Sequence, residues 1–211
     1  MRIHSIAVMV CLAFAVWGCV NLGGTSDPPV FYQLEYDSPS AMCGTGFKEA
    51  VRVWPFSASA PFEREEMVLA ENSTVVGLSR ANLWVAAPGR MITDHLIQDL
   101  GISELFTRTM SSSDPFMASL NIGGRIHKCT WVQSGENGHA VLELSVDLWR
   151  DLPNRRVLLR RRYTLESEPV AGRGPGDFAA TLSALTRDFS EQLQSDLCAV
   201  SADTPIPDDG L

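Results

Sequence analysis

The sequence lacks the excess of basic residues that nucleic-acid-binding proteins carry. It contains 17 Lys and Arg against 25 Asp and Glu, which gives a formal net charge of −8. Affinity for nucleic acid depends on neutralising phosphates with Lys and Arg, and a net acidic surface opposes this. We therefore exclude nucleic acid as a partner. With 45% hydrophobic and 20% charged residues, the composition is that of a globular protein of about one domain.

The apolar run near the N-terminus is too short to cross a bilayer. Ile6–Trp17 holds twelve residues, whereas a spanning helix needs about 20. The run follows Arg2 and ends at Gly18-Cys19, which is the pattern of an export signal. Residues 16–19 resemble the lipobox of bacterial lipoproteins, in which a small residue precedes the cysteine that takes the diacylglyceryl group. We expect residues 1–18 to be a lipoprotein signal peptide, with cleavage between Gly18 and Cys19 and lipidation of Cys19.

Lipidation would fix the protein at a membrane. Each buried methylene of an acyl chain contributes about 0.8 kcal/mol, so several chains on Cys19 would make attachment permanent. Val20 resembles the outer-membrane address of enteric lipoproteins, so we expect an outer-membrane anchor with the domain facing the periplasm. Residues 19–29 are rich in Gly, Ser and Pro and are expected to form a flexible tether. The alternative is an ordinary cleaved signal that ends by chance in a cysteine.

Catalytic and metal-binding motifs are missing. No Gly-x-Ser-x-Gly, His-Glu-x-x-His or Cys-x-x-Cys sequence occurs. His95 adjoins Asp94 on a predicted helix, where neighbouring side chains point about 100° apart and form no dyad by themselves. His127 and His139 could approach each other across a predicted hairpin, but two half-exposed strand residues are the simpler interpretation. The sequence thus predicts no catalytic residue, no metal site and no cofactor.

A glycine-rich segment, residues 172–176, precedes a predicted helix. Backbone amides at such a position can hold phosphate. The segment lacks the lysine of a P-loop, and Pro175 has no amide to offer. We interpret it as a flexible loop.

Three cysteines remain beyond the predicted cleavage site, namely Cys43, Cys129 and Cys198. Their spacings fit no zinc motif. In an oxidising periplasm two of the three could pair, and a bond between Cys43 and Cys198 would join the two ends of the domain. Three unpaired thiols are an equal alternative.

Hydrophobic periodicity predicts an α+β domain over residues 30–198, with a mostly antiparallel sheet and two helices packed on one face. Short strands are expected over residues 30–36, 47–56, 67–69 and 74–78. Three longer strands between residues 118 and 165 should form an antiparallel meander with a bulge before Cys129. One helix is expected to begin at Pro88 and to end or bend at Gly101. The second carries an apolar stripe from Phe178 to Leu197, and residues 199–211 are predicted to be a disordered tail.

Five arginines gather on the last predicted hairpin of this acidic protein, namely Arg155, Arg156, Arg160, Arg161 and Arg162. They could line the water-facing side of a strand and protect its edge from aggregation. Alternatively, four of them contact an acidic partner protein or lipid headgroups; these are Arg155, Arg156, Arg160 and Arg162. Both interpretations remain open at this point.

The order of these elements resembles the ABC-type transport auxiliary lipoproteins, a PqiC-like family. The resemblance runs from Phe31 to about Cys198 and rests on positions that carry the fold. They are Phe31-Tyr32-Gln33-Leu34, Val51-Arg52-Val53-Trp54-Pro55-Phe56, Leu83-Trp84, the Leu142–Trp149 strand, Arg162-Tyr163 and the Phe178–Leu197 helix.

The resemblance implies a non-enzymatic lipoprotein that forms a homo-oligomer. Members of the family accompany an ABC permease, its ATPase and a substrate-binding subunit with an MCE domain, and these systems move lipids across the envelope. The resemblance offers no catalytic residues. Two other classes stay open, an LptE-like outer-membrane assembly lipoprotein and a periplasmic enzyme.

Overall fold

A computed structural model of the chain describes residues 28–39, 43, 46–71, 75–151, 154–172 and 174–203. The predicted signal peptide, its cleavage site at Gly18 and the lipidation site Cys19 lie outside the described residues. So does most of the predicted tether, of which only Pro28 and Pro29 are described, without regular structure.

The described chain forms ten strands and two helices. In chain order they are β1 (Val30–Tyr32), β2 (Ala50–Val53), β3 (Ser57–Ala58), β4 (Glu66–Ala70), β5 (Val76–Trp84), α2 (Pro88–Ile102), β6 (Arg108–Ser111), β7 (Leu120–Ser134), β8 (Asn137–Arg150), β9 (Arg156–Glu166), β10 (Val170–Ala171) and α3 (Pro175–Asp203).

All ten strands belong to one sheet, built on the predicted antiparallel meander of β7, β8 and β9. The β7–β8 ladder pairs Leu120 with Arg150 at one end and Ser134 with Asn137 at the other. Its register shifts between Ile126 and Lys128, which is the bulge that the change of apolar phase before Cys129 predicts. The shorter strands β1, β2, β3 and β4 add parallel pairings, while β4 and β5 pair antiparallel.

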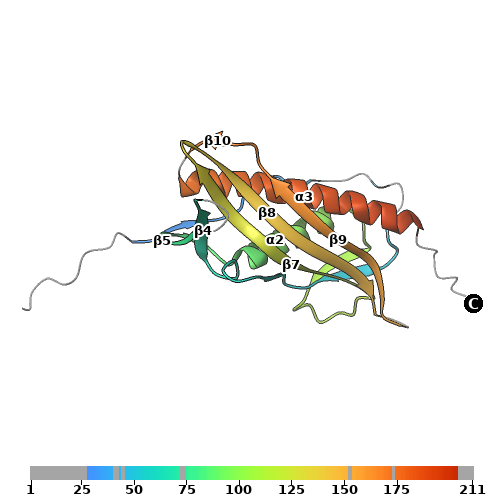
Figure 1. Cartoon of the computed structure of the whole chain (residues 1–211). Helices are drawn as coiled ribbons and strands as arrows, with labels where there is room; N and C mark the ends of the chain where they lie inside the picture. Colours follow the sequence, from blue (N-terminus) through green and yellow to red (C-terminus); the bar gives the residue numbers. More distant parts are fainter. Residues whose placement is uncertain are drawn as a thin grey trace, which may run out of the picture.

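Both helices cover the same face of the sheet, so the architecture is the predicted α+β arrangement. Figure 1 shows α3 lying along β8 and β9, with α2 beside it. The even-numbered residues Ala140–Leu148 of β8 and the α3 stripe Phe178–Leu197 are all buried, as their periodicities predict. A helix of 29 residues rises about 44 Å and a strand of 14 residues spans about 46 Å, so α3 can follow the full length of the meander.

The last helix is longer than the sequence analysis predicts. It continues to Asp203, so residues 199–203 are helical and do not belong to the tail expected from residue 199; residues 204–211 lie outside the described residues. Val200 packs against the core, and the Ser201 hydroxyl donates to the carbonyl of Cys198 at 2.9 Å. The sequence has no helix-breaking residue between Leu197 and Pro205. The apolar stripe ends at Leu197 and therefore does not predict the last turns of the helix.

Several short elements also differ from their predictions. α2 ends at Ile102, next to Gly101, where the sequence predicts an end or a bend. The buried Leu105 and Phe106 follow the helix, and β6 comes after them as a strand that the sequence does not predict. β5 extends to Trp84 because β1 pairs with its second half. β3 and β10 have two residues each, too few to show a period.

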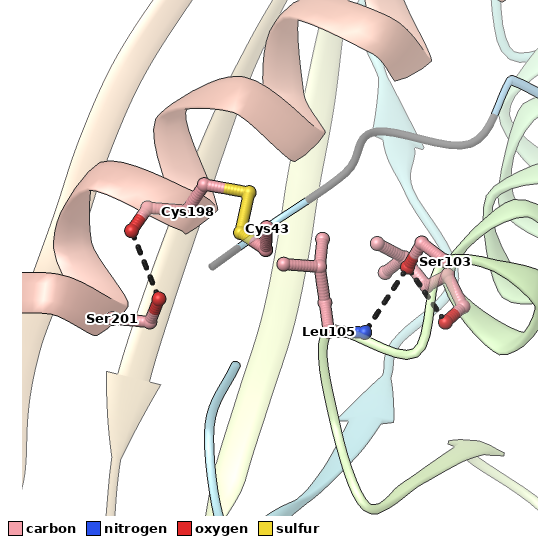
Figure 2. The surroundings of a disulfide bond; sticks show 6 residues. Cys43, Ser103, Leu105, Cys198 and Ser201 are labelled. Carbon is pink, nitrogen blue, oxygen red and sulfur yellow. Dashed lines mark hydrogen bonds between the residues drawn. A yellow bond between two sulfur atoms is a disulfide. The ribbon is translucent and has the colours of Figure 1, made fainter. Parts of the chain in front are cut away.

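Cys43 and Cys198 form a disulfide, which is one of the two alternatives that the sequence leaves open (Figure 2). Their Cα atoms lie 5.7 Å apart, within the usual range for such bonds. The bond ties the segment after β1 to the C-terminal part of α3. Cys129 is a buried free cysteine, and burial raises the pKa of its thiol to about 12.

Within the described ranges, neither helix is long and apolar enough to cross a membrane.

Candidate partner-contact surface

The face of β7, β8 and β9 opposite the helices carries alternating polar side chains, among them two of the predicted contact arginines. Arg160 donates to both oxygens of Asp147, at 2.8 and 3.1 Å, and Arg162 donates to Glu143 at 2.9 Å. Both pairs join β9 to β8. Their charges are therefore largely satisfied within the sheet, which matches the interpretation of a solvated strand face.

The remaining arginines of the group divide by position. Arg161 points to the helix side and pairs with Asp196 of α3, which also accepts a 2.7 Å hydrogen bond from the Tyr163 hydroxyl. Arg155 and Arg156 are exposed next to the β8–β9 turn, and neither forms an ion pair with a carboxylate of the described residues. Of the predicted contact residues, these two are the ones that keep an unneutralised charge.

Two tryptophans stand on this outer face beside the turn. The Trp54 indole N–H donates to Asn121 at 2.9 Å, the Asn121 amide donates to Asp151 at 2.9 Å, and Asp151 also accepts from the Trp149 indole at 3.1 Å. Gly123 lies between the rings, where a Cβ would meet the Trp149 ring at 3.2 Å and the Trp54 Cβ at 3.9 Å. The bridge and the glycine hold both indoles on one surface.

The loop from β6 to β7 is organised by one side chain of β2. The guanidinium of Arg52 donates to the carbonyls of Ser111 at 3.2 Å, Ser112 at 3.3 Å and Asp114 at 3.0 Å, and also to that of Phe116. The Asp114 carboxylate accepts from the Ser111 backbone N–H at 2.6 Å and from its hydroxyl at 2.8 Å. These hydrogen bonds hold the pKa of Asp114 below its usual range. The loop is therefore fixed in shape even though it lies at the surface.

This loop presents two adjacent apolar side chains to solvent. Phe116 is 54% exposed and Met117 is 85% exposed. The guanidinium of Arg108 lies 4.5 Å from the centre of the Phe116 ring, and that of Arg155 lies 5.2 Å from the Trp149 ring. We call the following six residues the arginine–aromatic surface: Trp54, Arg108, Phe116, Met117, Trp149 and Arg155.

A hollow of about 420 Å³ adjoins this surface. Gly123 contributes no side chain to its lining, which leaves the space open between Trp149, Arg125 and Arg160. The carboxylate in the lining belongs to Asp147, which is paired with Arg160. The hollow is therefore positively charged and is suited to an acidic group.

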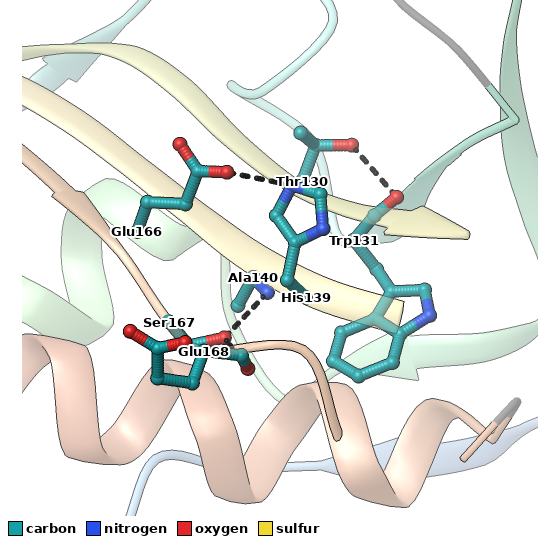
Figure 3. A network of polar contacts seen from close by, with 7 residues as sticks. All are labelled: Thr130, Trp131, His139, Ala140, Glu166, Ser167 and Glu168. Atoms are coloured by element: carbon teal, nitrogen blue, oxygen red, sulfur yellow. Dashed lines mark hydrogen bonds and ion pairs between the residues drawn. The ribbon is translucent and has the colours of Figure 1, made fainter. Parts of the chain in front are cut away.

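The histidines do not come together. His139 of β8 lies opposite Val132 of β7 and contacts Glu166 at 3.0 Å, as Figure 3 shows. His127 instead contacts the Ser145 hydroxyl at 3.0 Å. They occupy different positions along the hairpin, in agreement with the interpretation of two separate strand residues. Within the described segments, no three His, Cys, Asp or Glu side chains could hold a metal ion.

His95 and the glycine-rich segment have structural roles. The ring of His95 stacks on Tyr36 with centroids 4.6 Å apart, and its Nε2 faces the carbonyl of Leu34 at 3.1 Å. The amide of Gly174 donates to the carboxylate of Asp177 at 3.2 Å, so a side chain of α3 takes the place that a phosphate would occupy.

Sequence reasoning missed most of the arginine–aromatic surface. The alternation of side chains over residues 51–54 predicts that Arg52 and Trp54 face the opposite side from Val51 and Val53. It predicts no function for either residue. Phe116 and Met117 follow Asp114-Pro115, which indicates a turn, and no pattern in the sequence says that the turn is held open by Arg52. The surface joins β2, β6, β8 and their loops, and only the fold brings these together.

The family model of the ABC-type transport auxiliary lipoprotein component matches residues 32–194. The chain belongs to this family. It is thus an envelope-associated auxiliary component of an ABC-type transport system, as the order of its elements predicts.

Several solved structures share the fold of this chain. Protein XCC0632 from Xanthomonas campestris, of family DUF330, is 12% identical with a TM-score of 0.72, covering 82% of this chain and 98% of that one. An uncharacterized protein is 13% identical with a TM-score of 0.61, covering 81% and 99%. The hypothetical protein CT253 from Chlamydia trachomatis is 7% identical with a TM-score of 0.52, covering 75% and 100%. At these identities the likeness shows the fold alone, and no curated protein sequence matches the chain.

In this auxiliary lipoprotein the arginine–aromatic surface lies far from the strand at which the described chain begins. β1 reaches β7 through β5 and β4, and β4 pairs with β7 at Trp131. Trp149 instead pairs with Asn121. Through Leu83 of β5, β1 is level with Glu66 of β4, three residues before the partner of Trp131. It therefore lies about seven residues, or roughly 23 Å, along β7 from Asn121. Figure 1 shows β5 at one end of the molecule and the β8–β9 turn at the other.

Proposed function

We propose that the chain is a non-enzymatic subunit of an MCE-type ABC transport system that moves lipids across the envelope. Its task is to hold and position the MCE-domain substrate-binding subunit at the outer membrane. The observation that carries the proposal is the family match over residues 32–194, because it assigns an auxiliary role in ABC-type transport.

The proposal places lipid on Cys19 and the folded domain in the periplasm. The Cys43–Cys198 disulfide supports an oxidising compartment, because structural disulfides are rare in proteins of the bacterial cytosol. Among the described strands, the long strand β9 pairs with β8 alone, and a second edge of this kind is compatible with the proposed homo-oligomer.

Metabolic labelling tests the anchor. Cells that express the full chain are grown with a radiolabelled palmitate, and the membranes are separated by density. We expect label on the wild-type protein in the outer-membrane fraction and none on the Cys19→Ala variant. A wild-type protein without label, released as a soluble species, would contradict the anchor and the position derived from it.

Purification from crosslinked membranes tests the partner. We expect the wild-type chain to bring down an ABC permease, its ATPase and an MCE-domain subunit. The Cys19→Ala variant, which has no thiol to take the lipid, is the matched control for dependence on the anchor. Recovery of an outer-membrane assembly protein without any ABC subunit would refute the transport role.

A further inference from the structure

The arginine–aromatic surface concentrates one kind of contact. Among the described residues, all three arginine–aromatic contacts lie here: Arg52 with Trp54, Arg108 with Phe116 and Arg155 with Trp149. Tryptophan and arginine are the side chains that most often contribute the binding energy of protein interfaces. Their clustering therefore separates this end of the sheet from the rest of the outer face, where arginines pair with carboxylates.

The surface is held in shape before any partner arrives. Arg52 fixes the loop through four carbonyls, and the Asn121–Asp151 bridge fixes Trp54 and Trp149. Met117 nevertheless remains 85% exposed. A large apolar side chain exposed to water is costly to the isolated protein, and a loop backbone that is already ordered lowers the entropic cost of binding to a matching pocket.

The end of the sheet that carries the arginine–aromatic surface has a net positive charge, whereas the net charge of the whole chain is negative. Arg108, Arg155 and Arg156 form no ion pair with a described carboxylate, and the adjoining hollow is lined by Arg125 and Arg160. The carboxylates of Asp114, Asp147 and Asp151 keep their negative charges, but the arginines of this end outnumber them, namely Arg52, Arg108, Arg125, Arg155, Arg156 and Arg160. A chain with a net charge of −8 thus presents an excess of positive charge around the exposed apolar side chains of Phe116 and Met117. The complementary surface carries carboxylates around an apolar pocket.

Position and shape favour a protein over a bilayer as the occupant. The chain enters the domain at β1, which is level with Glu66 of β4 and thus lies about 23 Å along β7 from Asn121, the partner of Trp149. The arginine–aromatic surface therefore lies toward the other end of the sheet from the strand at which the described chain begins (Figure 1). Protruding apolar side chains on an ordered loop, next to a hollow, can fit a protein surface of complementary shape, whereas a fluid bilayer offers no pocket of fixed shape. Two copies facing each other through this surface would bring like charges together.

We infer that the arginine–aromatic surface docks a partner protein that presents an apolar pocket rimmed by Asp and Glu, with Met117 and Phe116 as the inserted side chains. This inference rests on the proposed function, in which such a partner is a subunit of the transport system. The hollow beside Gly123 receives one of the partner's carboxylates.

Site-specific photocrosslinking in intact cells tests the inference on the full lipidated chain. A photoreactive amino acid is placed at position 117, and at position 76 as the control, because Val76 is 51% exposed at the opposite end of the sheet. We expect position 117 to give an adduct with one polypeptide other than this chain, through a peptide rich in Asp and Glu. Position 76 should not give that adduct.

Charge reversal supplies the second arm. Arg155→Glu with Arg156→Glu should reduce the yield of the position-117 adduct at least tenfold. The matched control, Arg64→Glu with Arg187→Glu, reverses two exposed arginines elsewhere and should leave the yield unchanged. Far-ultraviolet circular dichroism of both variants shows whether each has folded. An equal loss in both variants would overturn the inference.

The identity of the adduct decides between occupants. Adducts with lipid alone, with a second copy of this chain alone, or no adduct at position 117 would each overturn the docking of a partner protein. If ABC subunits purify with the wild-type chain but position 117 contacts no protein, the inference fails and the proposed function stands. If position 117 contacts an acidic protein outside any ABC system, the surface is supported and the proposed function fails.

Discussion

Tyr36 donates a 2.9 Å hydrogen bond to the carboxylate of Asp99, a residue of α2 that is completely buried. The other oxygen of Asp99 has no partner among the described residues. This single contact joins the segment after β1 to the first helix. It also satisfies a group that is costly to bury alone.

Replacement of Tyr36 by Phe is therefore expected to destabilise the domain by about 1–3 kcal/mol, because it leaves the carboxylate without its donor. The midpoint of thermal unfolding should fall by about 2–4 °C for each kcal/mol. Tyr32→Phe is the control, since the Tyr32 hydroxyl donates only a long hydrogen bond of 3.4 Å to Asn82, in a partly buried position. Equal losses in the two variants would mean that the buried contact with Asp99 contributes nothing specific.

Stability should fall in alkaline solution. Burial, together with the neighbouring carboxylates of Asp99 and Asp196, raises the pKa of Tyr36 and Tyr163 far above the value of about 10 for a free tyrosine. In the unfolded chain both ionise near pH 10, while in the folded chain they stay neutral. Their contribution to the free energy of unfolding is thus complete below about pH 10 and is lost as the pH rises further.

Urea unfolding at intervals between pH 8 and pH 11 measures this loss. Tyr163→Phe should remove about a third of the slope of unfolding free energy against pH above pH 10, because the buried Cys129 thiol, whose pKa is raised to about 12, is a third contributing group. Tyr36→Phe should do the same, although it starts from a lower stability. A slope that neither variant changes would show that other groups cause the alkaline loss.

The disulfide should contribute to stability through the 155 residues that separate its ends. Closing a loop of this length stabilises a protein by about 2–5 kcal/mol, mainly by restricting the unfolded chain. Cys43→Ser and Cys198→Ser should each cost that amount, and the double variant no more than either one. Thiol titration of the unfolded, unreduced protein should find Cys129 but neither Cys43 nor Cys198. Free thiols at both positions would contradict the pairing.

Arg52→Lys should loosen the loop that carries Phe116 and Met117. A lysine ammonium cannot reproduce the planar fork that contacts four carbonyls. Chymotrypsin should cleave after Phe116 several-fold faster in this variant, as followed by mass spectrometry, with little change in global unfolding. Arg125→Lys, which removes a single contact with Ser59, is the control. Unchanged cleavage in Arg52→Lys would mean that the loop is held by other contacts.

The sequence predicts the fold where a hydrophobic period runs over many residues. In β8 and in α3 the apolar residues recur four or more times at the spacing of a strand or of a helix, so the sequence alone identifies the buried face of each element. β6 is different, because its buried Met110 stands alone between polar neighbours. The sequence also does not predict where α3 ends, since its last turns are stabilised by the packing of Val200 and the hydrogen bond of Ser201 and not by the apolar stripe.

The candidate surface is less visible in the sequence for a physical reason. A charge count finds the arginines of β9, but whether a given arginine is neutralised depends on the strand beside it. Arg160 and Arg162 face acids of β8, whereas Arg155 lies over Trp149. Trp54 and Trp149 are 95 residues apart and meet only through the β2–β7–β8 register. No local pattern encodes such a distance.

The direction of α3 bears on how the protein can be handled. The helix starts beside β10 and ends at Asp203 toward the β8–β9 turn (Figure 1). A fusion joined directly after Asp203 would therefore crowd the end of the molecule where Trp149 and Arg155 lie, while the proposed lipid would occupy the N-terminal side. An epitope inserted at the tight turn around Gly135, between β7 and β8, would sit at the other end and leave both sites unobstructed.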